Sequence, residues 1–253
     1  ATVPTTTSSG PMPSSARTTS RAPSAALTAV GSVPWTSSLV LLGNGIDLGR
    51  FDPVRVGPAP RHRVRAELGI GPDEVVVGTV ANFRAQKGYP DLLTAATLAP
   101  GVRVVAVGQG PLEDEIRARH RELGLGDRVQ LTGYVPDAGR VMSAFDVFTL
   151  ASVHEGLPVA LMDALVLGLP VAATDVGGIP QAVTHGVEGL LVPPRRPELL
   201  AAAWEELAAD PVRRAAMGAA ARVAGERFDI VHAAARLDRL YVSLAARRPG
   251  LCL

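Results

Sequence analysis

Apolar residues recur along this chain in short, nearly uninterrupted runs. From about residue 74 onward, six such runs succeed one another, at residues 74–83, 102–108, 128–133, 146–152, 170–175 and 189–193. A strand that is apolar at nearly every position is buried on both of its faces, which is typical of a parallel sheet covered by helices. We therefore predict that these runs form the strands of one parallel sheet.

Segments with a helical spacing of apolar residues lie between and after these runs. The segment at residues 111–123 begins with Pro111 and carries acids in its first turn and bases later, which suits the dipole of a helix. Further helices are expected at residues 89–99, 137–144, 157–168, 179–186, 198–210, 211–228 and 231–247. This alternation predicts an α/β fold with a doubly wound, Rossmann-like parallel sheet.

The first 40 residues differ in composition from the rest of the chain. Seventeen of them are Ser or Thr and five are Pro, while Arg17 and Arg21 are the only charged residues among them. Such a segment has too little apolar surface to offset the entropy of ordering, so we expect residues 1–38 to be disordered. The folded domain is then residues 39–253, and it starts with a short apolar strand and a glycine-rich turn in SLVLLGNGID.

The overall composition narrows the classes of partner. The 253-residue chain has a formal net charge of +1, so no strong field directs it to nucleic acid. Its single cysteine, Cys252, rules out a disulfide framework and a cysteine-based zinc site, and it suits a reducing, cytoplasmic compartment. No apolar run reaches the roughly 18 residues of a membrane span, and no signal peptide is recognisable. The arginines of the last helices allow at most peripheral contact with a membrane.

Glycine-containing loops come after the first five predicted strands. They lie at residues 82–88, 108–110, 133–135, 152–156 and 175–178. The first of them carries Lys87, the one lysine among 25 basic residues. Because ligands of doubly wound folds bind at the carboxyl ends of the strands, we expect the binding site at this edge of the sheet.

Two acids stand out in and beside the predicted helix at residues 157–168. Glu155 directly precedes Gly156, and Asp163 comes eight residues after Glu155 in an otherwise apolar run. The start of a helix presents free N–H groups that favour phosphate or sugar oxygens. A carboxylate at that place would repel phosphate but can accept hydrogen bonds from sugar hydroxyls. Taken alone, the acids also fit a simpler alternative, in which Glu155 stabilises the helix start and Asp163 lies on the exposed face of the helix.

A longer set of motifs carries a resemblance to a known family. NGIDLGRF, GTVANFRAQKGYPDLL, VGQGPLEDEI, LTGYV, AFDVFTLASVHEGLPVALMDALVLGLPVAATDVGGIPQAV and GVEGLLVPP occur in this order. Over about residues 40–246 the chain resembles the C-terminal, donor-binding domain of glycosyltransferase family 4 (group 1), whose members are retaining enzymes of GT-B fold. The resemblance implies a domain that transfers a sugar from a nucleotide-diphosphate sugar to an acceptor. The motifs fit several nucleotides, sugars and acceptors.

The resemblance also implies roles for individual residues. The family's acid–seven–acid motif matches Glu155, for the hydroxyls of the donor sugar, and Asp163, for the ribose hydroxyls, although the family usually has Glu at the second position. The family's lysine matches Lys87, whereas its arginine falls at Asn82, and Arg84 is the nearest guanidinium. The candidate catalytic residues are thus Lys87, Arg84 and Glu155. The candidate donor-binding residues are Asn82, Gly108, Gly110, Val135, His154, Gly156, Leu157, Asp163, Gly177 and Gly178, and residues 133–135 would line the pocket for the base.

The expected chemistry needs neither a metal nor a cofactor. Many sugar transferases hold a metal with an Asp-x-Asp motif, and this sequence has none. Because members of the resembled family are metal-independent, we expect Lys87 and Arg84 to stabilise the charge that develops on the leaving phosphate.

Two alternatives compete with this hypothesis. A nicotinamide-dependent oxidoreductase is excluded, because GTVANF stands where Gly-x-Gly-x-x-Gly would come after the first strand. The other alternative stays open, because the resembled enzymes bind the acceptor with an N-terminal domain, and only the Ser/Thr/Pro-rich segment precedes the match here. Either a separate chain supplies that domain, or this chain is a truncated or inactive nucleotide-sugar-binding module, and we expect little transfer by the chain alone.

Overall fold

The computed structural model describes residues 43–51 and 56–247. The disorder expected for residues 1–38, the beginning of the expected strand in SLVLLGNGID, and Cys252 lie outside the described residues. The described residues belong to one compact unit, which is built around one sheet.

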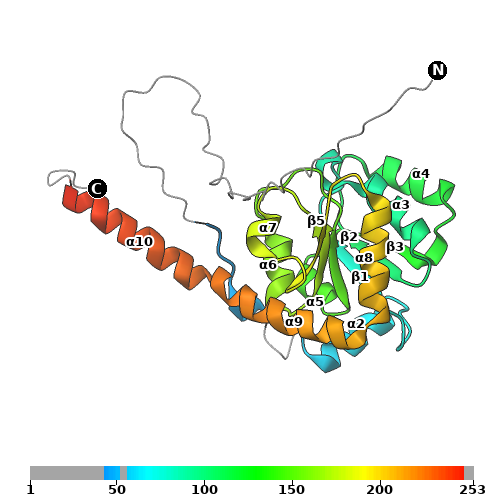
Figure 1. Cartoon of the computed structure of the whole chain (residues 1–253), viewed down its shortest axis with the longest axis horizontal. Helices are drawn as coiled ribbons and strands as arrows, with labels where there is room; N and C mark the ends of the chain where they lie inside the picture. The colour runs from blue at the N-terminus through cyan, green and yellow to red at the C-terminus, as the bar shows by residue number, and fades with distance from the viewer. Residues whose placement is uncertain (1–42, 52–55, 248–253) are drawn as a thin grey trace, which may run out of the picture. The chain divides into compact units, whose positions relative to one another are not determined.

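The sheet has the six strands that the apolar runs predict. They are β1 (Val76–Val80), β2 (Arg103–Val107), β3 (Val129–Gly133), β4 (Val147–Leu150), β5 (Val171–Thr174) and β6 (Gly189–Val192). Their order is β3-β2-β1-β4-β5-β6, and every neighbouring pair is parallel. The order reverses direction beside β1, which places a topological switch point between β1 and β4. The doubly wound, Rossmann-like sheet is therefore confirmed (Figure 1).

Helices cover both faces of this sheet. They are α2 (Pro58–Glu67), α3 (Tyr89–Leu98), α4 (Glu113–Glu122), α5 (Ala138–Met142), α6 (Val159–Val166), α7 (Ile179–Ala182), α8 (Pro197–Ala209), α9 (Pro211–Gly225) and α10 (Ile230–Arg247). Short 3-10 turns are η1 (Leu48–Phe51), η2 (Ala85–Lys87), η3 (Gly126–Arg128) and η4 (Glu226–Phe228). The expected helix at residues 111–123 begins only at Glu113, so Pro111 precedes it. None of the described helices is both long enough and apolar enough to cross a bilayer.

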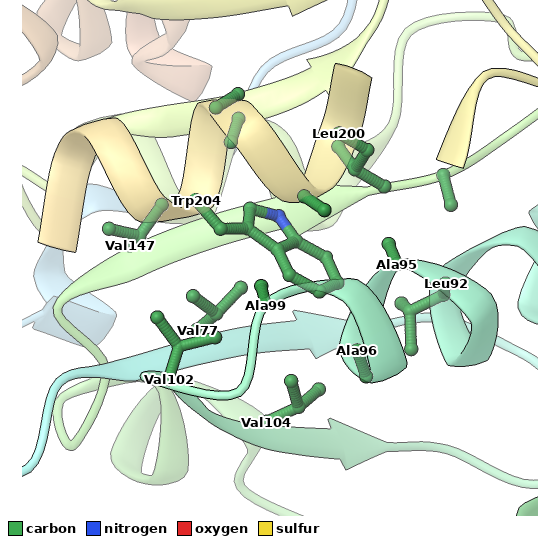
Figure 2. Close-up of a cluster of buried hydrophobic side chains, with 14 of the residues drawn as sticks. Val77, Leu92, Ala95, Ala96, Ala99, Val102, Val104, Val147, Leu200 and Trp204 are labelled. Atoms are coloured by element: carbon green, nitrogen blue, oxygen red, sulfur yellow. The ribbon is translucent and has the colours of Figure 1, made fainter. Parts of the chain in front are cut away.

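The two faces of the sheet carry separate apolar layers. Val77 and Val147 point to the layer beneath α3 and α8, and their neighbours Val76 and Phe148 point to the opposite layer, against α6. Trp204 of α8 is fully buried in the first layer, in the same cluster as residues of α3 (Figure 2). Alternate strand residues thus enter opposite layers, as the unbroken apolar runs require.

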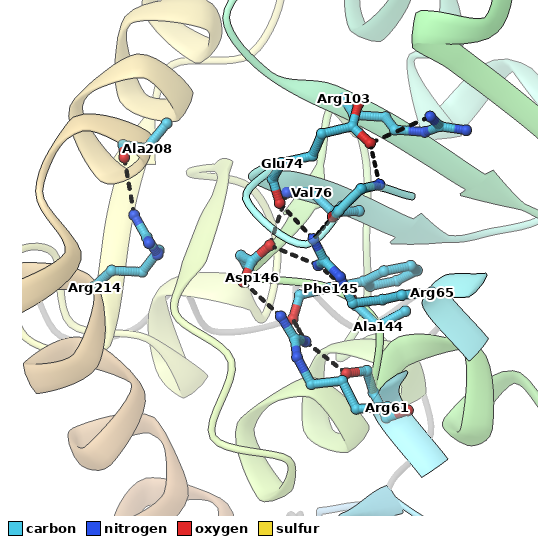
Figure 3. Close-up of polar contacts among 12 residues, drawn as sticks. Arg61, Arg65, Glu74, Val76, Arg103, Ala144, Phe145, Asp146, Ala208 and Arg214 are labelled. Atoms are coloured by element: carbon cyan, nitrogen blue, oxygen red, sulfur yellow. Dashed lines mark hydrogen bonds and ion pairs between the residues drawn. The ribbon is translucent and has the colours of Figure 1, made fainter. Parts of the chain in front are cut away.

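Helix α2 was not predicted, and the structure shows why. It is mostly polar, and its buried residues are Val64 and Arg65. Arg61 and Arg65 form ion pairs with Asp146 at 2.7 and 3.2 Å, and the amide of Val76 donates to the same carboxylate at 2.8 Å (Figure 3). This network fastens α2 to the amino ends of β1 and β4. The opposite edge of the sheet, where the carboxyl ends of the strands lie, is left for the predicted site.

Candidate functional site

A cavity of about 450 Å³ lies at the carboxyl ends of the strands. The loops after β1, β2 and β3 and the start of α6 line it. Five residues that the sequence singled out, by name or within residues 133–135, are brought together in this lining: Asn82, Lys87, Gly108, Tyr134 and Val135. The cavity therefore lies at the edge of the sheet where the strand–loop pattern predicts a binding site.

Lys87 and Glu155 form an ion pair in this region. The Lys87 Nζ atom lies 2.6 Å from Glu155 Oε1, and the two side chains are 16% and 7% exposed. The Ser152 hydroxyl donates to the same Glu155 oxygen at 2.7 Å. A cation and an acid from two distant loops thus meet where water is largely excluded, and their charges act on one another with little screening.

A close approach of two loops makes this pair possible. Gly88, directly after Lys87, has a φ of +64°, and a Cβ atom there would lie 1.9 Å from the carbonyl oxygen of Ala151. The amide of Val153 donates to the carbonyl of Gln86 at 2.9 Å. Only glycine fits at position 88 on both counts, so this residue determines how closely the Lys87 loop approaches the end of β4.

The start of α6 faces the cavity. Pro158 occupies the N-cap position, and Val159 and Ala160 form the first turn and contribute to the cavity lining. The first amides of a helix have no acceptor within the helix and can donate to a ligand. At Gly156, just before the helix, no heavy atom lies within 4 Å of where a Cβ would stand. A ligand can therefore approach the backbone closely at this point.

Four other predicted glycines have a packing reason. A Cβ atom would lie 2.0 Å from Ala81 O at Gly108, 2.6 Å from Phe83 O at Gly110, 1.8 Å from Glu155 O at Gly177, and 2.5 Å from Gly156 O at Gly178. The space beside these glycines is thus filled by the backbone of the neighbouring loop. Contact between their amides and a ligand stays a prediction.

Asp163 is buried within α6. It is 7% exposed, which shows that the alternative of an exposed helix face is wrong for this residue. Its Oδ1 atom is buried without a hydrogen-bond partner among the described residues. Burial raises the pKa of Asp163 above its ordinary value, and the Arg50 guanidinium acts in the opposite direction. A buried carboxylate oxygen without a donor is costly, so a ligand hydroxyl that reached it would find an unused acceptor.

None of the other predicted residues, Glu155 and Asp163 included, is part of the lining of this cavity. Arg84 and His154 are exposed on their loops. Leu157 lines a separate hollow of about 260 Å³, together with Asn44 and Phe228. Arg84 is thus not placed with Lys87 in the cavity, and its contribution to a positive site stays a prediction.

Two residues that the sequence did not single out adjoin the cavity or its ion pair. Gln109 lines the cavity, next to the 64% exposed Tyr134 of the predicted base pocket at residues 133–135. Ser152 is fully buried and bonded to Glu155. Gln109 and Ser152 lie in the glycine-containing loops after strands, so position in the chain was the available signal. Their residue types did not distinguish them from ordinary loop residues.

The chain is similar to proteins of known activity. A family model described as Glycosyl transferases group 1 matches residues 60–224. The D-inositol 3-phosphate glycosyltransferase of Segniliparus rotundus is 36% identical over 195 residues, which cover 73% of this chain and 42% of that protein. The GDP-mannose-dependent alpha-(1-6)-phosphatidylinositol monomannoside mannosyltransferase of Mycobacterium tuberculosis is 33% identical over 199 residues, which cover 74% and 51%. The chain thus spans about half the length of these relatives or less.

Solved structures share the fold. Anabaena Alr3699/HepE in complex with UDP and glucose superposes with a TM-score of 0.74 at 27% identity, covering 79% of this chain and 55% of that one. The sucrose-phosphate synthase of Thermosynechococcus elongatus also gives a TM-score of 0.74, at 29% identity, with coverage of 83% and 53%. In both structures the match is confined to about half of the larger chain.

Proposed function

Because the chain belongs to the Glycosyl transferases group 1 family, we propose that it binds a nucleotide-diphosphate sugar in the cavity at the carboxyl ends of its strands and takes part in transferring the sugar to an acceptor. The observation that carries the proposal is the pairing of Lys87 with Glu155. One cation and one acid, 68 positions apart, meet beside the start of α6.

Lys87 serves the diphosphate in this proposal. When the sugar leaves, negative charge develops on the phosphate oxygens, and positive groups held in place beside them lower the barrier. The Lys87 ammonium is such a group, and the free amides at the start of α6 are a second source of positive potential. The ammonium exchanges its partner Glu155 for phosphate when the donor enters.

Glu155 serves the sugar. Phosphate would be repelled by its carboxylate, whereas sugar hydroxyls donate hydrogen bonds to it. Gly156 leaves the neighbouring backbone open to a ligand. The two oppositely charged groups of the pair thus bind opposite ends of the bond that breaks.

Asp163 serves the ribose of the nucleotide. Its unpartnered buried Oδ1 supports this role, since a ribose hydroxyl would supply the missing donor. Asp is shorter than the Glu that the family usually has, so the ribose contact is longer or passes through water. Tyr134 and Val135 contact the base in this proposal, since both line the cavity at the carboxyl ends of the strands.

The proposal extends to the stereochemistry of transfer, its metal independence, its compartment and its substrates. Transfer retains the anomeric configuration, needs no metal, and takes place in the cytoplasm. The donor nucleotide is UDP or GDP, since structural neighbours were solved in complex with UDP and with UDP-glucose, and one relative is a GDP-mannose-dependent mannosyltransferase. The acceptor is held by residues outside the described part, in a further domain or in a separate chain.

Calorimetry with the purified chain tests donor binding. The chain is titrated with UDP, UDP-glucose, GDP and GDP-mannose, each with and without EDTA. Either the two uridine compounds or the two guanosine compounds should bind, and EDTA should leave their affinity unchanged. The exposed Arg63 of α2, at the other edge of the sheet, supplies a control variant, Arg63→Met, which should bind as the wild type does. Absence of binding by all four compounds would overturn the proposed function, and binding that EDTA abolishes would overturn its metal independence.

A further inference from the structure

Ser152, in the loop after β4, has its hydroxyl completely inside the protein. Its exposure is 0%, and its Oγ atom donates to Glu155 Oε1 at 2.7 Å. Lys87 Nζ approaches the same oxygen at 2.6 Å. Both donors therefore converge on Oε1, and no donor among the described residues reaches Oε2.

We propose that Ser152 is a positioning residue that fixes the Glu155 carboxylate so that Oε2 remains the acceptor for a hydroxyl of the donor sugar. This inference rests on the proposed function, because it assigns a use to the free oxygen of Glu155. Ser152 itself touches no donor sugar, and it acts through Glu155.

The surroundings of Ser152 make it suitable for this task. The Thr174 hydroxyl of β5 donates to the carbonyl of Ser152 at 2.6 Å, so the backbone of Ser152 is held from the neighbouring strand. The Glu155 carbonyl is in turn packed against Gly177. The two ends of the hydrogen bond between Ser152 and Glu155 are thus fixed to the same rigid sheet edge.

The contact with Ser152 matters most when the donor is bound. In the ligand-free protein, Lys87 and Ser152 together restrain Glu155. Once Lys87 turns to the diphosphate, the Ser152 hydroxyl is the one donor among the described residues that still holds Oε1. Without it, the carboxylate can rotate about its last torsion, which is broad for Glu, and the sugar loses an oriented acceptor. The nucleotide does not depend on this orientation.

The test compares affinities for a nucleotide and its sugar conjugate. Calorimetry is carried out with UDP and UDP-glucose, and with GDP and GDP-mannose. For whichever pair binds the wild type, it gives the ratio of the affinity for the nucleotide-sugar to the affinity for the free nucleotide. Ser152→Ala should lower that ratio about tenfold, as expected for one hydrogen bond to a charged group. Ser152→Cys, which keeps a weak donor of similar size, should give an intermediate ratio and supports the proposal even if Ser152→Ala folds poorly.

A matched control separates positioning from stability. Thr149 is equally buried, and its hydroxyl accepts from Trp204 at 3.0 Å and donates to the Ala172 carbonyl without touching Glu155. Thr149→Val should lower the melting temperature and leave the ratio unchanged. An unchanged ratio in both Ser152 variants would overturn the inference and leave the proposed function standing. If the wild type binds neither pair, the proposed function fails and the inference fails with it.

Discussion

Lys87 Nζ and Glu155 Oε1 are 2.6 Å apart, in side chains that are 16% and 7% exposed. In a site so little exposed, removing one partner leaves the other charge without compensation, and this is more damaging than removing both. Under the proposed function, the pair has two roles that must be reconciled, because it neutralises two buried charges in the ligand-free protein and opens when a donor binds.

A double-mutant cycle measures the stabilising part. Lys87→Met and Glu155→Gln should each lower the free energy of unfolding, Lys87→Met by about 3 kcal/mol because it leaves a buried carboxylate unpaired. The double variant should lose clearly less than the two single losses added together. Urea unfolding of the four proteins gives the coupling free energy. Strict additivity would show that the ion pair contributes nothing.

The single lysine of the sequence allows a direct test of where the donor binds. Acetylation with an amine-reactive reagent can modify Lys87 and the α-amino group, and mass spectrometry measures both. At a nucleotide-sugar concentration about ten times Kd, labelling of Lys87 should slow roughly tenfold because most sites are filled. The α-amino group serves as the internal control, and equal labelling of Lys87 with and without donor would contradict the proposed diphosphate contact.

The two acids should read different parts of the donor. Glu155→Gln should weaken binding of the nucleotide-sugar by about tenfold and leave that of the free nucleotide nearly unchanged, since a charged hydrogen-bond acceptor for the sugar is lost. Asp163→Asn should weaken both ligands by similar factors. Calorimetry with both ligands measures these changes. If the two variants weaken both ligands alike, the acids do not contact different parts of the donor.

The pH dependence of stability tests the burial of Asp163. Burial raises the pKa of Asp163 above its ordinary value of 3.8. The folded state then binds this proton more tightly than the unfolded state, so the contribution of the group to stability is present below pH 3.8 and is lost as pH rises through the folded value. Without ligand, Asp163→Asn should gain stability relative to the wild type as pH rises over this range. Urea unfolding of both proteins from about pH 3 to 8 measures the difference, and a difference that does not change with pH would contradict the prediction.

Substitution by alanine should reduce stability at Gly177 and ligand binding at Gly156. Gly177 has a φ of +57° and lies against the Glu155 carbonyl, so Gly177→Ala should cost at least about 2 kcal/mol of stability. Gly156 has open space at its Cα, so Gly156→Ala should change stability by less than about 0.5 kcal/mol. It should nevertheless weaken nucleotide-sugar binding, because the added methyl occupies the approach of the ligand. Thermal unfolding and calorimetry of both variants check the pair, and normal binding by Gly156→Ala would place the ligand elsewhere.

The strands, most of the helices and the edge of the sheet that carries the site could be predicted without coordinates. An uninterrupted apolar run indicates a strand that is buried on both faces. This signal is contained in the run itself, so each strand can be predicted without knowing its neighbours. The same pattern missed α2, because that helix is held by ion pairs from Arg61 and Arg65 to Asp146 and has little apolar periodicity. A polar helix fixed by distant partners leaves no periodic signal in its own residues.

The meeting of the loops could not be read from spacing along the chain. Lys87 and Glu155 belong to two separate loops, and their pairing depends on the approach of Gly88 to Ala151 between neighbouring strands. The burial of Asp163 could not be predicted either, because a lone acid in an apolar helix can face solvent or face the protein interior. Strand order, the rotation of α6 and the contacts between loops arise from packing between distant segments. The chain thus supplies the residue types of the site in its local patterns, and packing determines which of them face one another.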